Sequence, residues 1–190
     1  PTASINWTKG PDKKVSELKN KELTVKIREN EETLLDNFFS QTTVDAFHIS
    51  HKGKTIYTWH SDYCSSTTPH IIFSVSKSLT ALLIGCVIDE GLLSEETLVS
   101  QIIPETKGSA FEDASVRNLL DMSVSSNFIE DYEATSGIFL DYRQSTGWNP
   151  QDIDDTSHLK SFLFSLNKNT HKHGEKFEYH STNTDMLGII

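Results

Sequence analysis

The sequence has little cysteine and no export signal. Cys64 and Cys86 are the two cysteines among 190 residues, too few for the disulfide framework that holds small secreted domains together. Cys86 lies in an apolar run, so we expect a small buried side chain there. The first residues lack the charged and then apolar pattern of a signal peptide. These absences favour a cytoplasmic protein.

Long apolar runs and an excess of basic residues are missing too. No stretch approaches the roughly 18–20 apolar residues that a membrane-spanning helix needs. Lys and Arg number 17 against 27 Asp and Glu, which gives a formal net charge of −10. Nucleic acids and anionic membrane surfaces attract clustered positive charge, so we expect neither as a partner. Solubility is the simpler reason for an acidic surface.

What remains is the composition of a globular domain, with 36% hydrophobic and 23% charged residues. Residues 1–22 are polar and predict a lead-in segment. Residues 24–39 place apolar side chains near one helical face and predict a helix. Residues 45–51 and 54–60 are strand-like and predict a hairpin that turns at Lys52-Gly53.

The second part of the chain is expected to be mostly helical. From Ser74 onward the sequence is strongly helical, and it is apolar on nearly all sides from Leu79 to Ile88, which predicts a buried helix. Residues 123–150 show little periodicity and predict a loop that walls a cleft. Further helices are predicted at residues 115–122, 157–166 and 183–190.

A serine followed three residues later by lysine is a weak motif, because this chain contains it four times: Ser16–Lys19, Ser74–Lys77, Ser157–Lys160 and Ser165–Lys168. Nucleophilic chemistry needs the serine at the start of a helix, where the backbone N–H and the helix dipole stabilise an oxyanion. It also needs the lysine one turn later. That lysine must be buried, since desolvation lowers the pKa of an amine towards neutrality.

Among the four pairs, only Ser74–Lys77 meets these conditions. Strand-like Ile71-Ile72-Phe73 precede it and the apolar helix follows it, whereas the other pairs lie in polar surroundings. We therefore interpret Ser74 as a nucleophile and Lys77 as its proton acceptor. The alternative is a helix N-cap followed by a surface lysine.

Several segments of the sequence carry a resemblance to a known family. The run from Phe73 to Thr80, with Gly85 and residues 88–94, resembles the first motif and long helix of serine β-lactamases, penicillin-binding proteins and their esterase relatives. Within this superfamily, three further segments look most like the 6-aminohexanoate-dimer hydrolase group: Lys107-Gly108-Ser109-Ala110, Glu130-Asp131-Tyr132 and Ser145-Thr146-Gly147-Trp148.

The resemblance implies an α/β fold of the α+β type, in which an antiparallel sheet flanked by helices is joined to a mostly helical subdomain. It implies a serine hydrolase that cleaves a linear amide or carboxylic ester without a metal or organic cofactor. Residues 177–188 resemble the second motif of the superfamily, with Tyr179 as proton shuttle and Ser181 as its polar neighbour. Tyr132 matches the tyrosine that lies over the substrate amide. Core packing for Tyr179 and loop packing for Tyr132 are the alternatives.

The sequence departs from the family pattern in two places. Ser123-Val124-Ser125-Ser126 lacks the glycine of the family's turn, and no Lys-x-Gly or His-x-Gly third motif follows Tyr179. His51-Lys52-Gly53 has those letters but precedes the nucleophile. We therefore expect residues 23–190 to be a partial β-lactamase-like domain, with the start of the α/β part at 23–70 and the helical part with the active site at 71–190. A second chain or a further C-terminal segment would supply the missing strands.

The histidines suggest a rival function, metal binding. His48 with His51, or His171 with His173, could pair as metal ligands, but no His-Glu-x-x-His motif is present. We expect the 171–173 run to be solvated and no metal to be bound. β-Lactamase or D-amino-acid peptidase activity stays open, as does a non-catalytic binding or sensor module of the same fold.

Overall fold

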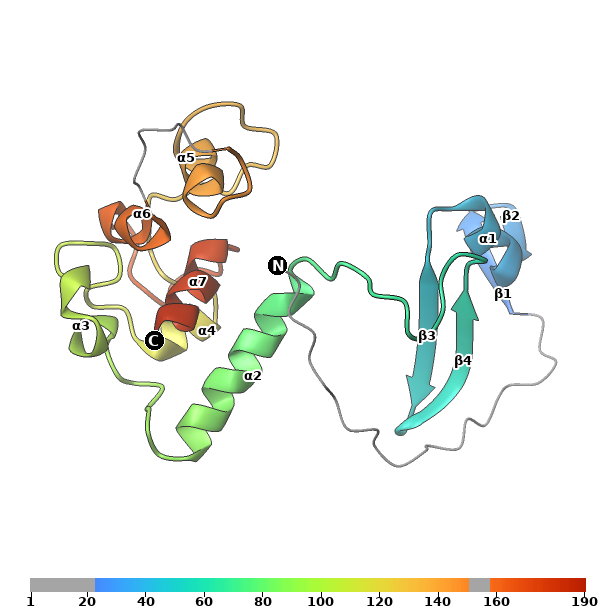
Figure 1. Ribbon diagram of the computed structural model, residues 1–190, viewed down its shortest axis with the longest axis horizontal. Helices are drawn as coiled ribbons and strands as arrows, with labels where there is room; N and C mark the ends of the chain where they lie inside the picture. The colour runs from blue at the N-terminus through green and yellow to red at the C-terminus, as the bar shows by residue number, and fades with distance from the viewer. Residues whose placement is uncertain (1–22, 151–157) are drawn as a thin grey trace. The chain divides into compact units, whose positions relative to one another are not determined.

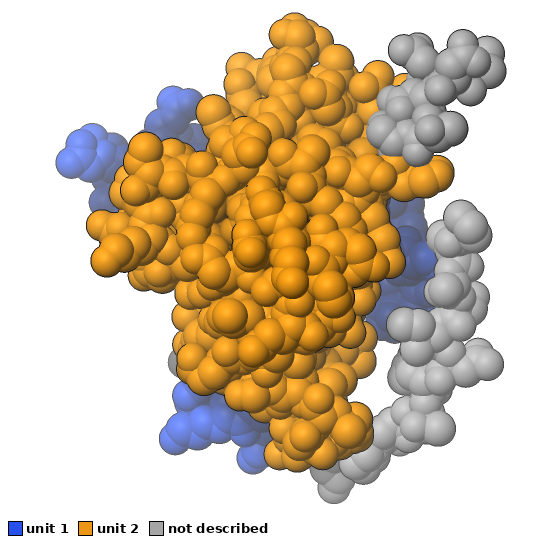
Figure 2. Space-filling model, turned by 90° about the vertical axis from the view of Figure 1, so that its left-hand side faces the viewer, with its two compact units in different colours: residues 1–71 blue, residues 72–190 orange. Residues whose placement is uncertain are grey.

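The computed structural model describes residues 23–150 and 158–190, and the chain divides into two compact units, residues 1–71 and 72–190 (Figure 2). The lead-in predicted for residues 1–22 lies outside the described residues. Within residues 23–71, the first unit contains two antiparallel strand pairs and one helix (Figure 1): β1 Thr24–Arg28, β2 Glu31–Leu34, α1 Leu35–Gln41, β3 Ala46–His51 and β4 Lys54–His60.

The second unit is helical in the part that the structure describes (Figure 1). Its elements are α2 Val75–Asp89, α3 Val99–Ile102, the short 3-10 helix η1 Pro104–Thr106, α4 Val116–Leu120, α5 Ile138–Ser145, α6 Leu159–Ser165 and α7 Ser181–Ile189. The helices predicted after Ser74, at 115–122 and at 183–190 are confirmed. The helix predicted at 157–166 is confirmed within its described residues, since residue 157 lies outside them.

The helix predicted at residues 24–39 is wrong over most of its length. Residues 24–34 form the β1–β2 hairpin, and only the last part of the predicted segment is helical, in α1. Thr24, Val25 and Ile27 are β-branched and favour extended backbone. Asn30 lies in the turn between the strands, where a short polar side chain is favoured.

The second hairpin is confirmed almost residue for residue. Lys52 and Gly53 both have positive φ angles, 49° and 72°, as a two-residue hairpin turn requires. The pairing register places Phe47 opposite Trp59. The buried ring of Phe39 from α1 packs on both, with ring centroids 4.7 Å from Phe47 and 5.0 Å from Trp59. This aromatic cluster is the core of the first unit.

The core of the second unit gathers side chains from segments far apart in the sequence. α7 packs against both α2 and α4. Part of the region predicted as a loop at residues 123–150 is the helix α5, whose Phe139 and Tyr142 face the core. Of the residues that the structure describes, the largest fully buried side chains lie here: Phe111, Phe128, Leu119, Leu163, Leu166 and Met186.

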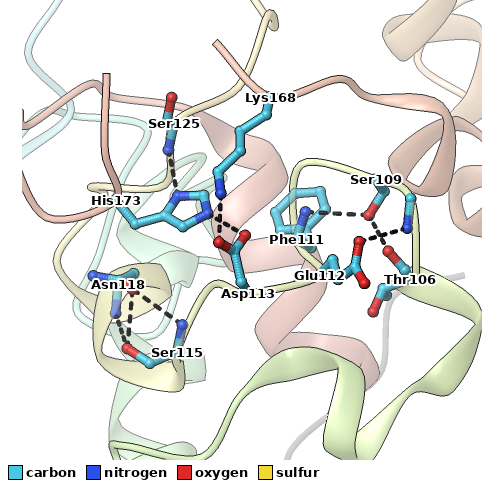
Figure 3. Close-up of polar contacts among 11 residues, drawn as sticks. Thr106, Ser109, Phe111, Glu112, Asp113, Ser115, Asn118, Ser125, Lys168 and His173 are labelled. Carbon is cyan, nitrogen blue, oxygen red and sulfur yellow. Dashed lines mark hydrogen bonds and ion pairs between the residues drawn. The ribbon is translucent and has the colours of Figure 1, made fainter. Parts of the chain in front are cut away.

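Short-range polar contacts hold the segment between η1 and α4 in place (Figure 3). The Ser109 hydroxyl donates to the Thr106 carbonyl at 2.7 Å and accepts the Phe111 N–H at 3.1 Å. Ser115 caps α4 by accepting the Asn118 N–H at 3.2 Å. Because these bonds satisfy the backbone locally, the loop can bury the ring of Phe111 completely.

The helix α2 is less buried than its sequence predicts. Among its residues only Ile84 is buried, while Leu82 and Leu83 are each 67% exposed. Cys86 is exposed too, so the expectation of a buried thiol is wrong. Burial depends on what packs against a helix, and within the described residues α2 packs chiefly against α7. No helix of the described residues has the length and apolar character needed to cross a membrane.

Candidate active site

A strained turn brings the chain into α2. Residues 71–74 are irregular rather than the strand that the sequence predicted, and Phe73 has a left-handed φ of 40°. This conformation costs a bulky residue on the order of 1–2 kcal/mol. The Val75 N–H donates to the Ile72 carbonyl at 3.0 Å, and the Lys77 N–H to the Ser74 carbonyl at 3.1 Å. These bonds close the turn and make Ser74 the residue at which the helix begins.

Ser74 and Lys77 meet at this turn. The Lys77 Nζ donates to the Ser74 Oγ at 2.9 Å. Ser74 is the N-cap residue of α2 by position, but its hydroxyl makes no capping bond to the helix backbone, so it stays available to the lysine. Ser74 is exposed and Lys77 is half-buried. The burial that the sequence led us to expect for Lys77 is therefore only partial.

The backbone N–H of Ser74 is open as well. Within the described residues it donates to no backbone carbonyl or side chain. It also belongs to the first turn of a 15-residue helix, whose N-terminal end carries partial positive charge. A donor in this position can stabilise negative charge on an oxygen bound beside Ser74.

Tyr179 lies against the same lysine. The Lys77 Nζ is 5.4 Å from the centroid of the Tyr179 ring, within the range of a cation–π contact. Tyr179 is 41% exposed, which argues against the alternative of a buried core tyrosine. Three predicted residues, Ser74, Lys77 and Tyr179, thus lie together, although more than half of the sequence separates Tyr179 from the other two.

The segment that carries Tyr179 is held by the turn that lacks the family's glycine. The Glu178 N–H donates to the Met122 carbonyl at 2.8 Å, and the Gly174 N–H donates to the Ser123 carbonyl at 2.9 Å. Met122 itself takes the left-handed conformation, with φ of 52°. The turn therefore forms without a glycine, and its carbonyls fix the backbone on both sides of the 175–177 stretch.

Tyr132 and Ser181 meet at a carboxylate to which the sequence analysis gave no role. The Glu130 carboxylate accepts the Ser181 N–H at 2.5 Å, the Ser181 hydroxyl at 2.8 Å and the Tyr132 hydroxyl. This contact with Glu130, assisted by partial burial, raises the pKa of Tyr132 to about 12. The Glu130-Asp131-Tyr132 motif was the signal in the sequence, but only Tyr132 was singled out.

A second polar pair was missed altogether. The Tyr142 hydroxyl on α5 donates to Asp185 Oδ2 on α7 at 2.7 Å. Burial raises the pKa of Asp185, while the hydrogen bond from Tyr142 and the charge of Lys77 act in the opposite direction. Asp185 lies one helical turn after Ser181, on the same face. That spacing was the available signal in the sequence. The charge of Lys77 thus acts on a partly buried carboxyl group.

Two aromatic rings and a hollow lie within this unit. Phe73 stacks on Trp148, with ring centroids 6.2 Å apart, and both side chains are more than half exposed. A hollow of about 600 Å³ is lined by Ser126, Asn127, Phe128, Ile129, Glu130, Asn169, Glu178, Tyr179 and His180. Residues of the predicted cleft loop thus do line a hollow, and Tyr179 lies at its wall.

The 171–173 run is not solvated as predicted. The side chains of His171 and His173 are 7% and 8% exposed, and each lies 3.1 Å from a carboxylate oxygen, of Glu178 and Asp113 respectively. The His173 Nδ1 accepts the Ser125 N–H at 2.9 Å (Figure 3). Residues 23–150 and 158–190 contain no group of three or more His, Cys, Asp or Glu side chains suited to a metal ion.

One other serine–lysine pair can be compared in full. The Ser165 hydroxyl donates to the Phe162 carbonyl at 2.7 Å, and Lys168 forms an ion pair with Asp113 (Figure 3). Ser165 and Lys168 therefore have other partners. Ser16–Lys19 and Ser157 lie outside the described residues.

Comparisons with known proteins agree with this geometry. A family model described as Beta-lactamase matches residues 35–190. The 6-aminohexanoate-dimer hydrolase of Paenarthrobacter ureafaciens is 31% identical over 156 residues, which are 82% of this chain and 39% of that protein. A solved structure of a Bacillus anthracis protein, provisionally named a 6-aminohexanoate-dimer hydrolase, matches with a TM-score of 0.76 and 21% identity over 91% of this chain and 46% of the other.

The extent of these matches bears on both fold and identity. The structural match confirms the predicted mixed fold of antiparallel strands and helices. The chain spans about two fifths of the length of the curated relative. The family model covers most of the chain, from α1 to the last residue. The chain therefore belongs to the β-lactamase family.

Proposed function

We propose that this protein is a serine hydrolase that cleaves a linear amide or a carboxylic ester through an acyl-enzyme on Ser74. Neutral Lys77 takes the proton from the Ser74 hydroxyl as that oxygen attacks the carbonyl carbon. The Ser74 N–H stabilises the oxyanion. Tyr179 passes a proton to the leaving group, and water then hydrolyses the acyl-enzyme.

One observation carries the proposal: the 2.9 Å contact between Lys77 Nζ and Ser74 Oγ at the start of α2. A proton can move between the two atoms without any change of position, because the distance is that of a formed hydrogen bond. The Tyr179 ring beside the same nitrogen supports its part in the proton transfer.

The substrate class follows from the relatives. A curated protein 31% identical to this chain is named for the hydrolysis of the 6-aminohexanoate dimer. Tyr132 and Ser181 are the substrate-binding candidates. Tyr132 is 65% exposed, and its hydroxyl donates to Glu130, which lines the hollow together with Tyr179. We propose a linear amide as the preferred class, with esters as substrates of the same chemistry.

The test is intact-protein mass after incubation with a reactive aryl ester or a phosphonate probe. The wild-type chain is expected to gain one adduct, and the Ser74→Ala variant none. Ser165→Ala is the matched control, because it removes a serine with the same spacing to a lysine, and it should be labelled like the wild type. A labelled Ser74→Ala chain, or an unlabelled wild type, would contradict the proposal.

The family match favours one alternative, the acylation of Ser74 by a β-lactam. The same machinery attacks both kinds of carbonyl, and the shape of the pocket decides between them. Parallel incubation with a chromogenic β-lactam separates the two, since release of its colour without turnover of linear amides would favour the β-lactamase. A single stable adduct without turnover of either substrate would instead indicate a binding or sensor module.

A further inference from the structure

The Glu130 carboxylate links two parts of the candidate site. Glu130 lies in the loop between α4 and α5, whereas Ser181 is the first residue of α7. Two of its three hydrogen bonds come from Ser181, through the backbone N–H and the hydroxyl, and the third comes from Tyr132. One half-buried side chain thus joins the substrate-facing tyrosine to the helix that follows Tyr179.

The bonds to Ser181 act on the position of Tyr179. His180 is the N-cap residue of α7 and makes no side-chain capping bond, so the Glu130 carboxylate takes the place of a cap from another segment. A negative charge at this end of a helix is also favoured by the helix dipole. Tyr179 lies two residues before Ser181, and the direction in which its backbone enters the helix is therefore fixed by Glu130.

The bond from Tyr132 acts on the direction of its hydroxyl. The Tyr132 ring rests edge-on against the buried ring of Phe139, with centroids 5.2 Å apart. Its hydroxyl proton points at Glu130, so the remaining lone pairs of the phenol oxygen face away from the carboxylate. A ring held at both ends loses little further freedom when a substrate binds.

We propose that Glu130 is a positioning residue of the hydrolase, which orients Tyr132 towards the substrate and anchors the start of α7 behind Tyr179. This inference rests on the proposed function, since it assigns to Glu130 a task in that reaction. Glu130 acts through these two elements and does not touch the reacting atoms.

Glu130→Gln is the informative variant, because glutamine keeps the shape and loses the charge. Its amide can accept at only one end, and its NH2 group cannot accept the Ser181 N–H. Acylation by an aryl ester is expected to slow by on the order of 10-fold or more, through lost alignment. Glu133→Gln removes the same charge from an exposed side chain of the same loop and should leave the rate unchanged.

A double-mutant cycle separates positioning from general destabilisation. If Glu130 acts partly through Tyr132, the combined loss of rate in Glu130→Gln with Tyr132→Phe will be smaller than the product of the two single losses. The ionisation of Tyr132 provides a second readout that needs no activity. The tyrosinate absorbance of Tyr132 at about pH 10.5 is the part that Tyr132→Phe removes. Tyr132→Phe should remove absorbance from the Glu130→Gln variant, in which Tyr132 is ionised, and none from the wild type, in which it is not.

The outcomes distinguish this inference from the proposed function. A wild-type chain that forms no Ser74 adduct would overturn the proposed function and, with it, the task of Glu130. A labelled wild type together with an unaffected Glu130→Gln variant would overturn the inference alone. Independent effects of Glu130→Gln and Tyr132→Phe, or an unchanged Tyr132 ionisation, would overturn the link between these two residues.

Discussion

The start of α2 and the end of α6 carry the same pair of residues with opposite results. Ser74 and Lys77 lie one turn apart where a helix begins, and the lysine reaches the serine. Ser165 is the last residue of α6, so the chain has left the helix before Lys168. Ser165 bonds back to its own helix, and Lys168 pairs with Asp113.

The position of the serine–lysine pair within a helix therefore decides its chemistry. Spacing of three residues brings two side chains together only while the backbone remains helical between them. At the end of α6 the Ser165 hydroxyl donates to a carbonyl of its own helix, a common partner for serine. At the start of α2 no such carbonyl precedes the serine, and the lysine becomes its partner.

Replacing the two lysines gives the largest contrast. Lys77→Met should lower the rate of Ser74 acylation by roughly 10²–10⁴-fold, because the step loses its general base. Lys168→Met should leave that rate unchanged and lower stability by at most about 1 kcal/mol, since its pair with Asp113 is partly exposed. Acylation rates and urea denaturation measure both. Equal effects on acylation would remove the distinction between the two sites.

Acidification should weaken the contacts of His173, which lies beside Asp113, the partner of Lys168. Burial lowers the pKa of His173 below its ordinary value of 6.5, although Asp113 acts in the opposite direction. The unfolded chain therefore binds a proton at His173 more readily than the folded chain does. The contribution of neutral His173 is fully present above about pH 6.5 and is lost as the pH falls through the lowered pKa of the folded chain.

Urea denaturation between about pH 7 and pH 5 measures this loss. The slope from one such group cannot exceed about 1.4 kcal/mol per pH unit. The Ser125 N–H bond to His173 Nδ1 requires that nitrogen to be unprotonated, so protonation there would break it. A His173→Asn variant should show a flatter pH dependence, and a slope equal to that of the wild type would exclude His173 as the source.

The smallest expected effect is that of replacing Cys86, near the C-terminal end of α2. Cys86 is exposed, so a thiol reagent should modify it in the folded chain at a rate close to that of an unfolded control. Cys86→Ser should change the free energy of unfolding by no more than about 0.5 kcal/mol, as for other surface positions. Strong protection of Cys86 would show that α2 is covered along this face, in contrast to its open start.

Much of the fold could be predicted from local sequence. The β3–β4 hairpin follows from a two-residue turn with glycine, and α2 from its apolar composition. The helix expected at 24–39 failed because apolar spacing alone does not separate a short strand pair from a helix. α5 was missed because its helical stretch is short and only one side of it meets the core.

The candidate site could be predicted only in part. Ser74 and Lys77 are close in sequence, and Tyr179 and Tyr132 were found through resemblance. Glu130 and Asp185 were given no role, because a motif or a helical spacing does not show what a carboxylate contacts, and their partners lie 51 and 43 residues away. Hydrogen bonds across such separations exist only once the core has brought the segments together.

Local backbone preference and residue identity are enough to predict where α2 begins, which serine and lysine share its first turn, and which family the chain resembles. Tertiary structure alone decided that Tyr179 lies against Lys77, that Glu130 joins Tyr132 to α7, and that much of α2 is exposed. Contacts and burial depend on which segments pack together, and one segment's own residues do not specify its neighbours.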